Sequence, residues 1–463
     1  MNAIILTAIL GVCMMFLGVF SKSKNLPHLV AILGVLGILA ADIAEYASGH
    51  PFMKISVHNM LSAGPFSLIF IAISLLATLY YFLLNGSEIQ KVGSHVAEYY
   101  ALIFFVLCGV SIAATFNTLL MLFIGVEIMS IPLYILTGSD KRNLKSNEAA
   151  LKYFLMGAFS TGIMLMGIAF LYGGNPLASF YLDKLSIGSG PMSIFTAIGL
   201  IFTLIALSFK VSAAPFHFWT PDVYDGAPTV FTAFMSTVVK AAAFVAFIRL
   251  FENSFGAIHA QWQLMVALIT AATLFFGNIT AVFQQSVKRM LAYSSIAQAG
   301  FMMLAIFALN DRAKEGLLLY SASYSVATIG LFAILSRMED YTIEGFNGLA
   351  KQQPTVALAG VVFLCSLTGI PLTAGFQSKF MLLMATVEYG QLFWLVIVAV
   401  LLAAVSAYYY FRVIQAMYFK ELTADKLLMQ NVSASFKIWL IVGIILVLII
   451  GIYPELIIGW LYR

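Results

Sequence analysis

The sequence predicts an all-α polytopic membrane protein with about fourteen transmembrane helices, arranged as two inverted five-helix repeats that each contain a broken helix. The composition is the first reason. The 463 residues are 62% hydrophobic and only 10% charged, with a mean hydropathy of +0.98, which is typical of membrane proteins rather than soluble domains. The second reason is that apolar runs recur at the length of roughly 20 residues that spans a bilayer. The third is that two longer runs are interrupted by proline or glycine.

The expected spans follow one another with polar connections too short to hold a soluble domain. The first run has no basic residue before it and no small-residue cleavage site, so we interpret it as a retained span rather than a signal peptide. The approximate limits are 3–20, 28–48, 65–84, 97–116, 118–137, 147–172, 192–224 (broken), 228–250, 262–283, 286–310, 315–336, 354–388 (broken), 391–419 and 436–461.

The basic residues predict the orientation. An even number of spans puts both termini on one side, and cytoplasmic connections are enriched in Lys and Arg. The side of the termini carries Lys54, Lys184, Arg312, Lys314 and Arg463. The other side carries Lys22, Lys24, Lys91, Lys141, Arg142, Lys145, Lys288, Arg289, Arg337, Lys351, Lys420, Lys426 and Lys437. Both termini are therefore predicted to be periplasmic, and the net charge of +4 needs no nucleic-acid partner to explain it.

The two broken spans organise the rest of the chain. Residues 208–221 read SFKVSAAPFHFWTP, where Pro215 is expected to break the helix five residues after Lys210. The second break lies in GIPLTAGFQSKF, where Gly369, Pro371 and Gly375 precede the lysine of this stretch, Lys379. These are the seventh and twelfth spans, so they cross in opposite directions, as in inverted-repeat transporters. The expected units are 1–96 (spans 1–3), 97–250 (first repeat), 262–419 (second repeat) and 436–463 (span 14).

Five charged residues within the spans are candidate proton-relay sites: Glu127, Lys152, Lys210, Lys240 and Lys379. A lysine at membrane depth costs on the order of 3 kcal/mol if it is isolated and charged. A hydrated row of sites that gain and lose protons explains such residues more economically. The alternatives are a fixed ion pair between Glu127 and Lys210 and a Lys152 that extends to the cytoplasmic surface.

Other polar residues near these sites have two interpretations each. His217 follows the first break and is either a relay member or a histidine with satisfied hydrogen bonds. Asp222 and Asp225 are expected to cap the helix that begins near 228–229. A polar stretch in the tenth span either holds water between charged sites or joins helices by hydrogen bonds. It consists of Ser294, Ser295 and Gln298.

The sequence contains no pattern for a redox cofactor or a metal. Cys13, Cys108 and Cys365 are single residues in apolar runs, and no dinucleotide, phosphate-loop, haem or iron–sulfur motif is present. We therefore expect no cofactor and no metal in this chain.

Five stretches resemble the antiporter-like membrane subunits of respiratory complex I. They are VEIMSIPLYIL, ALKYFLMGAFSTG, SFKVSAAPFHFWTPDVYDGAPTVFTAFMSTVVKAAAF, QQSVKRMLAYSSIAQAGF and GIPLTAGFQSKF, which together extend from Glu127 to Lys379. The resemblance implies that Glu127, Lys210 and Lys240 match the family's glutamate and lysines on spans five, seven and eight. It also implies that Lys379 exchanges protons with the outside. Gln298 stands where many relatives have a titratable histidine.

The resemblance also implies a function and partners. The expected function is proton translocation in the bacterial inner membrane, driven by quinone reduction elsewhere in an NADH–quinone oxidoreductase, a translocase. NADH, FMN, iron–sulfur clusters and quinone would belong to partner subunits. The contacts would be neighbouring antiporter-like and small membrane subunits, together with lipids.

Three features indicate which of the family's subunits the chain resembles. The expected spans do not include the long lateral C-terminal helix of subunit L, and GFQSKF has a lysine where subunit M has a glutamate. The stretch KYFLMGAFSTG is similar to subunit N. The alternatives are a subunit of a multi-subunit Na⁺/H⁺ antiporter or membrane-bound hydrogenase, and a scaffold whose charges only hold helices together.

Overall fold

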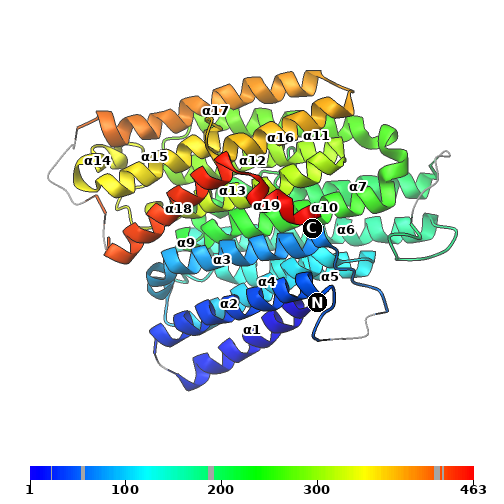
Figure 1. The fold of residues 1–463 in the computed structure, drawn as a ribbon, viewed down its shortest axis with the longest axis horizontal. Coiled ribbons are helices and arrows are strands. Elements are labelled where there is room, and N and C mark those ends of the chain that lie inside the picture. Colours follow the sequence, from blue (N-terminus) through cyan, green and yellow to red (C-terminus); the bar gives the residue numbers. More distant parts are fainter. Residues whose placement is uncertain (22, 54–57, 186–191, 422–427, 430–431, 463) are drawn as a thin grey trace.

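The computed structural model describes residues 1–21, 23–53, 58–185, 192–421, 428–429 and 432–462, and within these it is a bundle of helices with four isolated β-bridges and no strand. Most of the helices run along the long axis of the molecule (Figure 1). Lys22, Lys54, Lys426 and Arg463, which contributed to the predicted orientation, lie outside the described residues. The helices in chain order are α1 (Asn2–Phe20), α2 (Asn25–Ser48), α3 (Pro65–Val92), α4 (Val96–Thr115), α5 (Leu119–Thr137), α6 (Leu144–Gly174), α7 (Ile194–Lys210), α8 (Trp219–Gly226), α9 (Thr229–Phe234), η1 (Met235–Val239), α10 (Lys240–Phe255), η2 (Gly256–Ile258), α11 (His259–Val282), α12 (Val287–Ala308), α13 (Asp311–Leu335), η3 (Glu344–Phe346), α14 (Leu349–Gln352), α15 (Pro354–Thr368), α16 (Ala374–Tyr389), α17 (Trp394–Phe419), α18 (Ala434–Ile452), α19 (Glu455–Ile458) and η4 (Gly459–Tyr462).

Among the described residues, eleven helical stretches are long and apolar enough to cross a membrane. One of them, Thr229–Val282, contains both the eighth and the ninth expected spans, and the two broken spans are divided into shorter helices. The polytopic all-α class is therefore confirmed, whereas the number fourteen stays a prediction.

The first interruption does not begin where the sequence analysis placed it. Helix α7 ends at Lys210 rather than near Pro215, because Ser212 has a φ of 64° and turns the chain out of the helix. Pro215 lies in the middle of the connection, and α8 begins at Trp219. The second interruption begins as expected, since α15 ends at Thr368 and Gly369 has a φ of 90°.

The last span also differs from its predicted limits. A single run over 436–461 was expected, but α18 ends at Ile452 and Pro454 begins a short second segment. Proline has no backbone N–H and cannot continue the hydrogen-bond ladder of α18.

Helices α12 and α13 form the centre of the bundle (Figure 1). The apolar part of α13 is entirely buried and that of α12 nearly so, whereas α1 and α18 are mostly exposed. Two sets of contacts repeat along the chain: α4 contacts α5 and α10, and α11 contacts α12 and α17. These contacts involve helices at corresponding positions of the two expected five-helix repeats.

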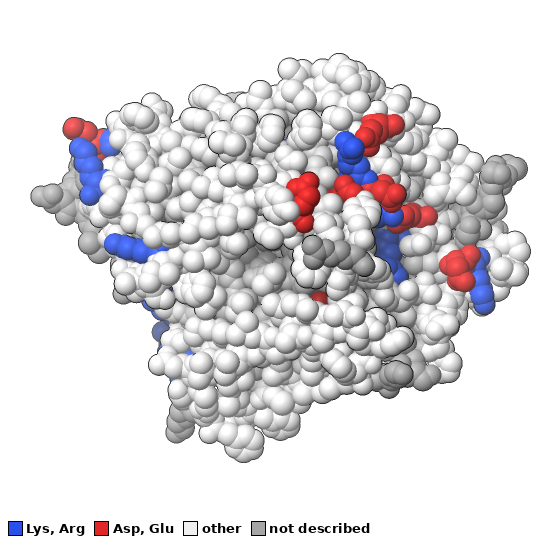
Figure 2. Space-filling model, viewed as in Figure 1, with Lys and Arg blue, Asp and Glu red and all other residues white. Residues whose placement is uncertain are grey.

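The surface has a wide uncharged region. Figure 2 shows basic side chains mainly at the left end of the molecule and a mixed group of acidic and basic side chains towards the right, with few charges between them. Both termini lie right of centre in the same view (Figure 1). A broad apolar surface between two charged regions is what a bilayer-spanning bundle requires.

Candidate functional site

The first group of charged residues joins α5, α6 and α7. Lys210, at the last position of α7, donates to Ser130 Oγ at 2.9 Å, and its Nζ lies 4.0 Å from Glu127 Oε1. Thr161 of α6 donates to the same Glu127 oxygen at 2.7 Å. The lysine side chain is 11% exposed and the glutamate side chain 23%. The structure therefore brings Glu127 and Lys210 together, as the sequence analysis expected, and gives each a hydroxyl partner.

Lys152 belongs to a second and more exposed group. Its side chain is 44% exposed, and its amine lies 2.8 Å from Glu148 and 3.0 Å from Asp222. Arg289 of α12 lies 2.9 Å from the other oxygen of Asp222. Nine residues, about 13 Å along a helix, separate Lys152 from Thr161 in α6. The structure thus places Lys152 in an ion-pair network apart from the Glu127–Lys210 pair.

This network corrects one expectation about the aspartates. Helix α9 begins after Pro228 without a side-chain cap, so neither Asp222 nor Asp225 caps it. Asp222 binds Lys152 and Arg289 instead, and the Arg289 guanidinium lies 3.9 Å from Asp225. The position of the two aspartates shortly before α9 suggested that they cap this helix. In the structure the Asp222 carboxylate binds the basic side chains of α6 and α12 instead.

Lys240 is the most deeply buried of the five candidates, with 2% of the residue exposed. Its Nζ donates to the carbonyl oxygen of Ser295 at 3.0 Å and to Ser295 Oγ at 3.1 Å, and it lies 5.6 Å from the centre of the Tyr224 ring. The five residues before it, Met235–Val239, form a π-helix. Such π-helical turns inside α-helices are frequent at functional sites, because the inserted residue changes the direction of the side chains that follow.

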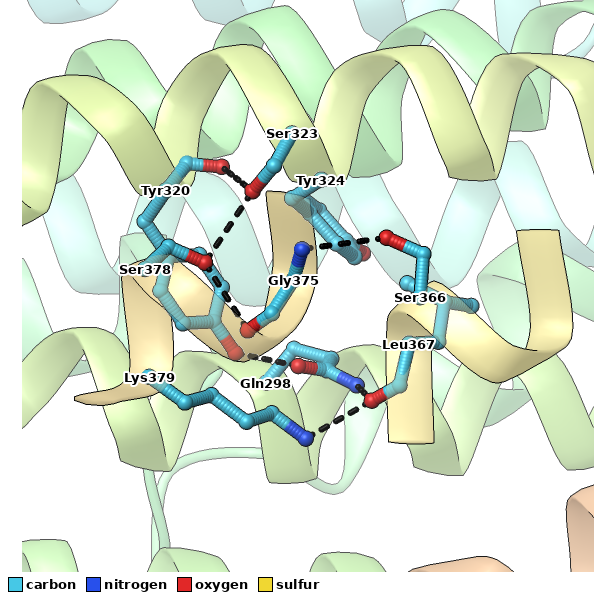
Figure 3. Close-up of a pocket in the computed structure, with 9 residues that line it drawn as sticks. All are labelled: Gln298, Tyr320, Ser323, Tyr324, Ser366, Leu367, Gly375, Ser378 and Lys379. Atoms are coloured by element: carbon cyan, nitrogen blue, oxygen red, sulfur yellow. Dashed lines mark hydrogen bonds between the residues drawn. The ribbon is translucent and has the colours of Figure 1, made fainter. Parts of the chain in front are cut away.

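Lys379 lies at the second interruption, in a small polar cavity (Figure 3). Its Nζ donates to the Leu367 carbonyl at 2.7 Å and to the Thr368 carbonyl at 3.1 Å, which are carbonyls at the C-terminal end of α15. The amine also lies 4.5 Å from the centre of the Phe301 ring. A cation is stabilised at a helix C-terminus, where the last carbonyls have no partner within the helix. The cavity volume of about 10 Å³ is room for one water molecule.

Helix α12 carries hydrogen-bonding groups near both buried lysines. Ser295 accepts from Lys240, and Gln298, one turn further along α12, donates to the same Leu367 carbonyl that binds Lys379, at 2.9 Å. Tyr320 donates to the Gln298 amide oxygen (Figure 3). The polar stretch of α12 therefore joins helices by hydrogen bonds, which is one of its two expected roles, while a role in holding water between the charged sites stays a prediction.

His217 is not brought into contact with the lysines. Its ring stacks on Phe218 and Phe276, and its Nδ1 is buried without a hydrogen-bond partner among the described residues. Three buried hydroxyl groups near the first interruption share this property; they belong to Ser208, Ser212 and Thr220. Buried polar groups of this kind are usually satisfied by internal water. A relay role for His217 stays a prediction.

Sequence reasoning missed one buried lysine and the hydroxyl partners. Lys288 was counted only among the basic residues of the cytoplasmic side, but it is only 4% exposed and donates to the Asp225 and Ala227 carbonyls at 2.8 and 2.7 Å. Ser130, Thr161 and Tyr320 are ordinary residues of helices until the packing brings them to a charged group. In the sequence, the burial of Lys288 is indicated only by its place two residues after Ser286, the residue that caps the start of α12.

Buried ammonium groups beside two helix interruptions, with hydroxyl and amide groups near them, are typical of antiporter-like ion-translocating membrane proteins. Residues 117–406 match the family described as "NADH:quinone oxidoreductase/Mrp antiporter, TM". NADH-quinone oxidoreductase subunit N of Cytophaga hutchinsonii is 38% identical over 464 residues, covering 98% of this chain and 98% of the relative. The same subunit of Trichlorobacter lovleyi is 38% identical over 460 residues, covering 98% of this chain and 94% of the relative.

Solved structures agree with the sequence relatives. A chain of respiratory complex I from Thermus thermophilus with bound aureothin has a TM-score of 0.84 and 31% identity, covering 99% of this chain and 98% of that chain. A chain of the Mrp complex from Dietzia has the same TM-score of 0.84 but 18% identity, covering 99% of this chain and 95% of that chain, so its likeness is one of fold. The protein belongs to the NADH:quinone oxidoreductase/Mrp antiporter family and is similar over nearly its whole length to subunit N sequences.

Proposed function

We propose that the chain is a proton-translocating membrane subunit of a bacterial NADH–quinone oxidoreductase, the respiratory complex I. The full-length similarity to subunit N sequences supports this assignment. Its partners are the other complex I subunits, in particular neighbouring antiporter-like and small membrane subunits. The chain acts as a non-redox part of the translocase. NADH, FMN, iron–sulfur clusters and quinone are held by partner subunits.

The proton path that we propose leads from the exposed charged residues to the buried ones. Lys152 and its ion-pair network lie at the surface, Glu127 and Lys210 form the first buried pair, Lys240 lies at the centre and Lys379 at the far interruption. An ammonium with a carboxylate neighbour keeps its proton, and one left alone in a low-dielectric interior releases it. Separation of Glu127 from Lys210 would therefore drive a proton towards Lys240.

One observation carries the proposal: Lys240 bonds Ser295, Lys379 shares the Leu367 carbonyl with Gln298, and Ser295 and Gln298 lie one turn apart on α12. A lysine that only stabilised the bundle would not need polar groups on the adjacent helix that lead towards a second buried lysine. The packing of α4, α5 and α10 and of α11, α12 and α17 supports the proposed repeat units 97–250 and 262–419. The units 1–96 and 436–463 are proposed to flank them.

The test compares three substitutions in the assembled complex, reconstituted into vesicles. Lys240→Ala and Lys240→Arg are both expected to lower proton uptake by at least about tenfold, because alanine carries no proton and arginine does not release one. Lys141→Ala, at an exposed position, is the control and should leave uptake unchanged. Full pumping by an assembled Lys240→Arg complex would support the scaffold alternative instead.

The antiporter alternative is less favoured. The likeness to the Mrp complex is one of fold at 18% identity, whereas the subunit N relatives are 38% identical over nearly the whole chain. Purification of the intact complex distinguishes the complex I assignment from the antiporter alternative. Cofactor-bearing peripheral subunits are expected to co-purify, and recovery of small membrane subunits alone would contradict the complex I assignment.

A further inference from the structure

A groove at the edge of the bundle contains an acidic residue that the proton path does not use. It lies between α2, α3 and the C-terminal segments α19 and η4, and has a volume of about 280 Å³. Its wall is almost wholly aliphatic, with Ile43 and Leu76 half exposed and Leu68 buried. Asp42 is the acidic member of this wall and is only 1% exposed.

The Asp42 side chain has an unmet requirement for a hydrogen-bond donor. Its Oδ1 is buried without a partner among the described residues. Glu45, three residues further along α2, is already engaged, since it accepts from the Met1 amine at 2.7 Å and from the Asn2 backbone N–H at 2.9 Å. An ionised carboxylate only accepts hydrogen bonds, and a buried one without a donor is costly.

Two aromatic residues beside the groove indicate its depth in the membrane. Tyr46, one turn of α2 beyond Asp42, donates to the carbonyl oxygen of Trp460, and their rings meet edge to face at 5.9 Å. Tyr and Trp are enriched at the membrane–water interface. The Asp42 carboxyl group thus lies about one helical turn, ~6 Å, inside that interface, at a depth where the headgroup region meets the acyl chains.

We propose that the groove binds a phospholipid that carries a primary ammonium headgroup, with one acyl chain along the aliphatic wall and the ammonium group directed to Asp42. The carboxylate of Asp42 favours a headgroup that is positively charged and has N–H donors. A primary ammonium both neutralises a carboxylate and donates hydrogen bonds to it, whereas a quaternary ammonium has no N–H and an anionic headgroup is repelled. The aliphatic wall, in turn, suits an acyl chain rather than a soluble amine.

The test uses the whole complex in nanodiscs of phosphatidylethanolamine, phosphatidylcholine or phosphatidylglycerol with identical acyl chains, with retained lipid counted by native mass spectrometry after delipidation. We expect retention of phosphatidylethanolamine to exceed that of the other two lipids by about tenfold, as a charge-assisted hydrogen bond implies. Asp42→Asn should abolish this preference. Equal retention of the three lipids, or an unchanged preference in Asp42→Asn, would overturn the proposal.

A matched pair of substitutions tests the groove itself. Ile43→Trp fills the groove and should prevent retention, whereas Leu33→Trp, on the same helix and similarly exposed at 59% against 50%, should not. Retention by Ile43→Trp, or a side chain of a neighbouring subunit found in the groove, counts against the site. If Ile43→Trp fails to assemble, the comparison of headgroups with Asp42→Asn still decides the question. The proposal does not depend on proton translocation.

Discussion

Gln298 is the residue on which the proposed path between the two buried lysines depends. It donates to the Leu367 carbonyl and to Tyr410, and it accepts from Tyr320. Gln298→Leu preserves the approximate volume but leaves these partners without the amide, at a cost of about 1–3 kcal/mol for each buried group. We expect proton pumping to fall by at least tenfold while the complex still assembles. Proton uptake by vesicles, with assembly followed on native gels, measures both.

The matched control for Gln298→Leu is Gln298→His, which keeps a polar ring that donates and accepts hydrogen bonds. It should retain a large part of the pumping activity. If Gln298→Leu pumps as well as the unmodified complex, protons do not pass this point of α12, and the proposed connection is wrong.

Thr161 provides a separate test of the Glu127–Lys210 pair. Thr161→Val keeps the shape of the side chain and removes the hydroxyl group that donates to Glu127 at 2.7 Å. Loss of a hydrogen bond to a charged group costs about 1.5 kcal/mol, so proton uptake should slow by roughly tenfold. Thr203→Val is the control, since the Thr203 hydroxyl bonds only to carbonyls of its own helix. Equal rates in the two variants would show that the hydroxyl has no part in transport.

For single residues, the sequence revealed the charged groups and the Glu127–Lys210 pair, but not the hydroxyl groups that bond to them. Glu127, Lys210, Lys240 and Lys379 stand out because a charge within an apolar run is costly and so needs a reason. Ser130, Thr161 and Tyr320 could not be found in the same way, since hydroxyl groups are common in helices and acquire a role only through packing. Lys152 stood out equally, yet the structure places its amine in an exposed ion-pair network.

Among the elements, the second interruption depends on one glycine. A Cβ on Gly375 would lie 1.8 Å from the Ser366 carbonyl oxygen, so the start of α16 can approach the end of α15 only without a side chain. This approach places Lys379 beside the last carbonyls of α15. Gly375→Ala should displace α16 and destabilise the subunit by at least about 1–3 kcal/mol. Thermal unfolding of the purified complex measures the loss.

The control is Gly37→Ala, in the interior of α2, where an added Cβ meets nothing within 4 Å. Alanine is the better helix former by about 1 kcal/mol, so this variant should be as stable as the unmodified complex or more so. A Gly375→Ala complex with an unchanged melting temperature would show that α15 and α16 separate without cost.

The helices themselves were predictable to within a few residues in most cases, because each apolar run is close to one membrane thickness. Two predicted helix ends were wrong because the backbone conformation, rather than the hydrophobicity of the sequence, ends the helix there. Helix α7 stops at Lys210 because Ser212 turns the chain, which no apolar pattern records. Helix α18 stops before Pro454, although the apolar run continues beyond it.

For the whole molecule, the orientation of the chain in the membrane determines which way protons would move. The connection between α5 and α6 contains the exposed Lys141, and the connection after α6 contains the exposed Asp183, so one membrane crossing separates them. The positive-inside rule places the more basic side, with Lys141, in the cytoplasm. We therefore expect Lys141→Cys to react with a membrane-impermeant maleimide only in inside-out vesicles, and Asp183→Cys only in right-side-out spheroplasts.

The unsubstituted protein is the control for background labelling, since Cys13, Cys108 and Cys365 all lie within helices of the bundle and an impermeant reagent should not reach them. The two substitutions must report opposite sides, because a single crossing of α6 lies between them. If Lys141→Cys reacts from outside and Asp183→Cys from inside, the termini are cytoplasmic. Lys379 would then exchange protons with the cytoplasm, and the direction proposed for the Lys210, Lys240 and Lys379 series would be reversed.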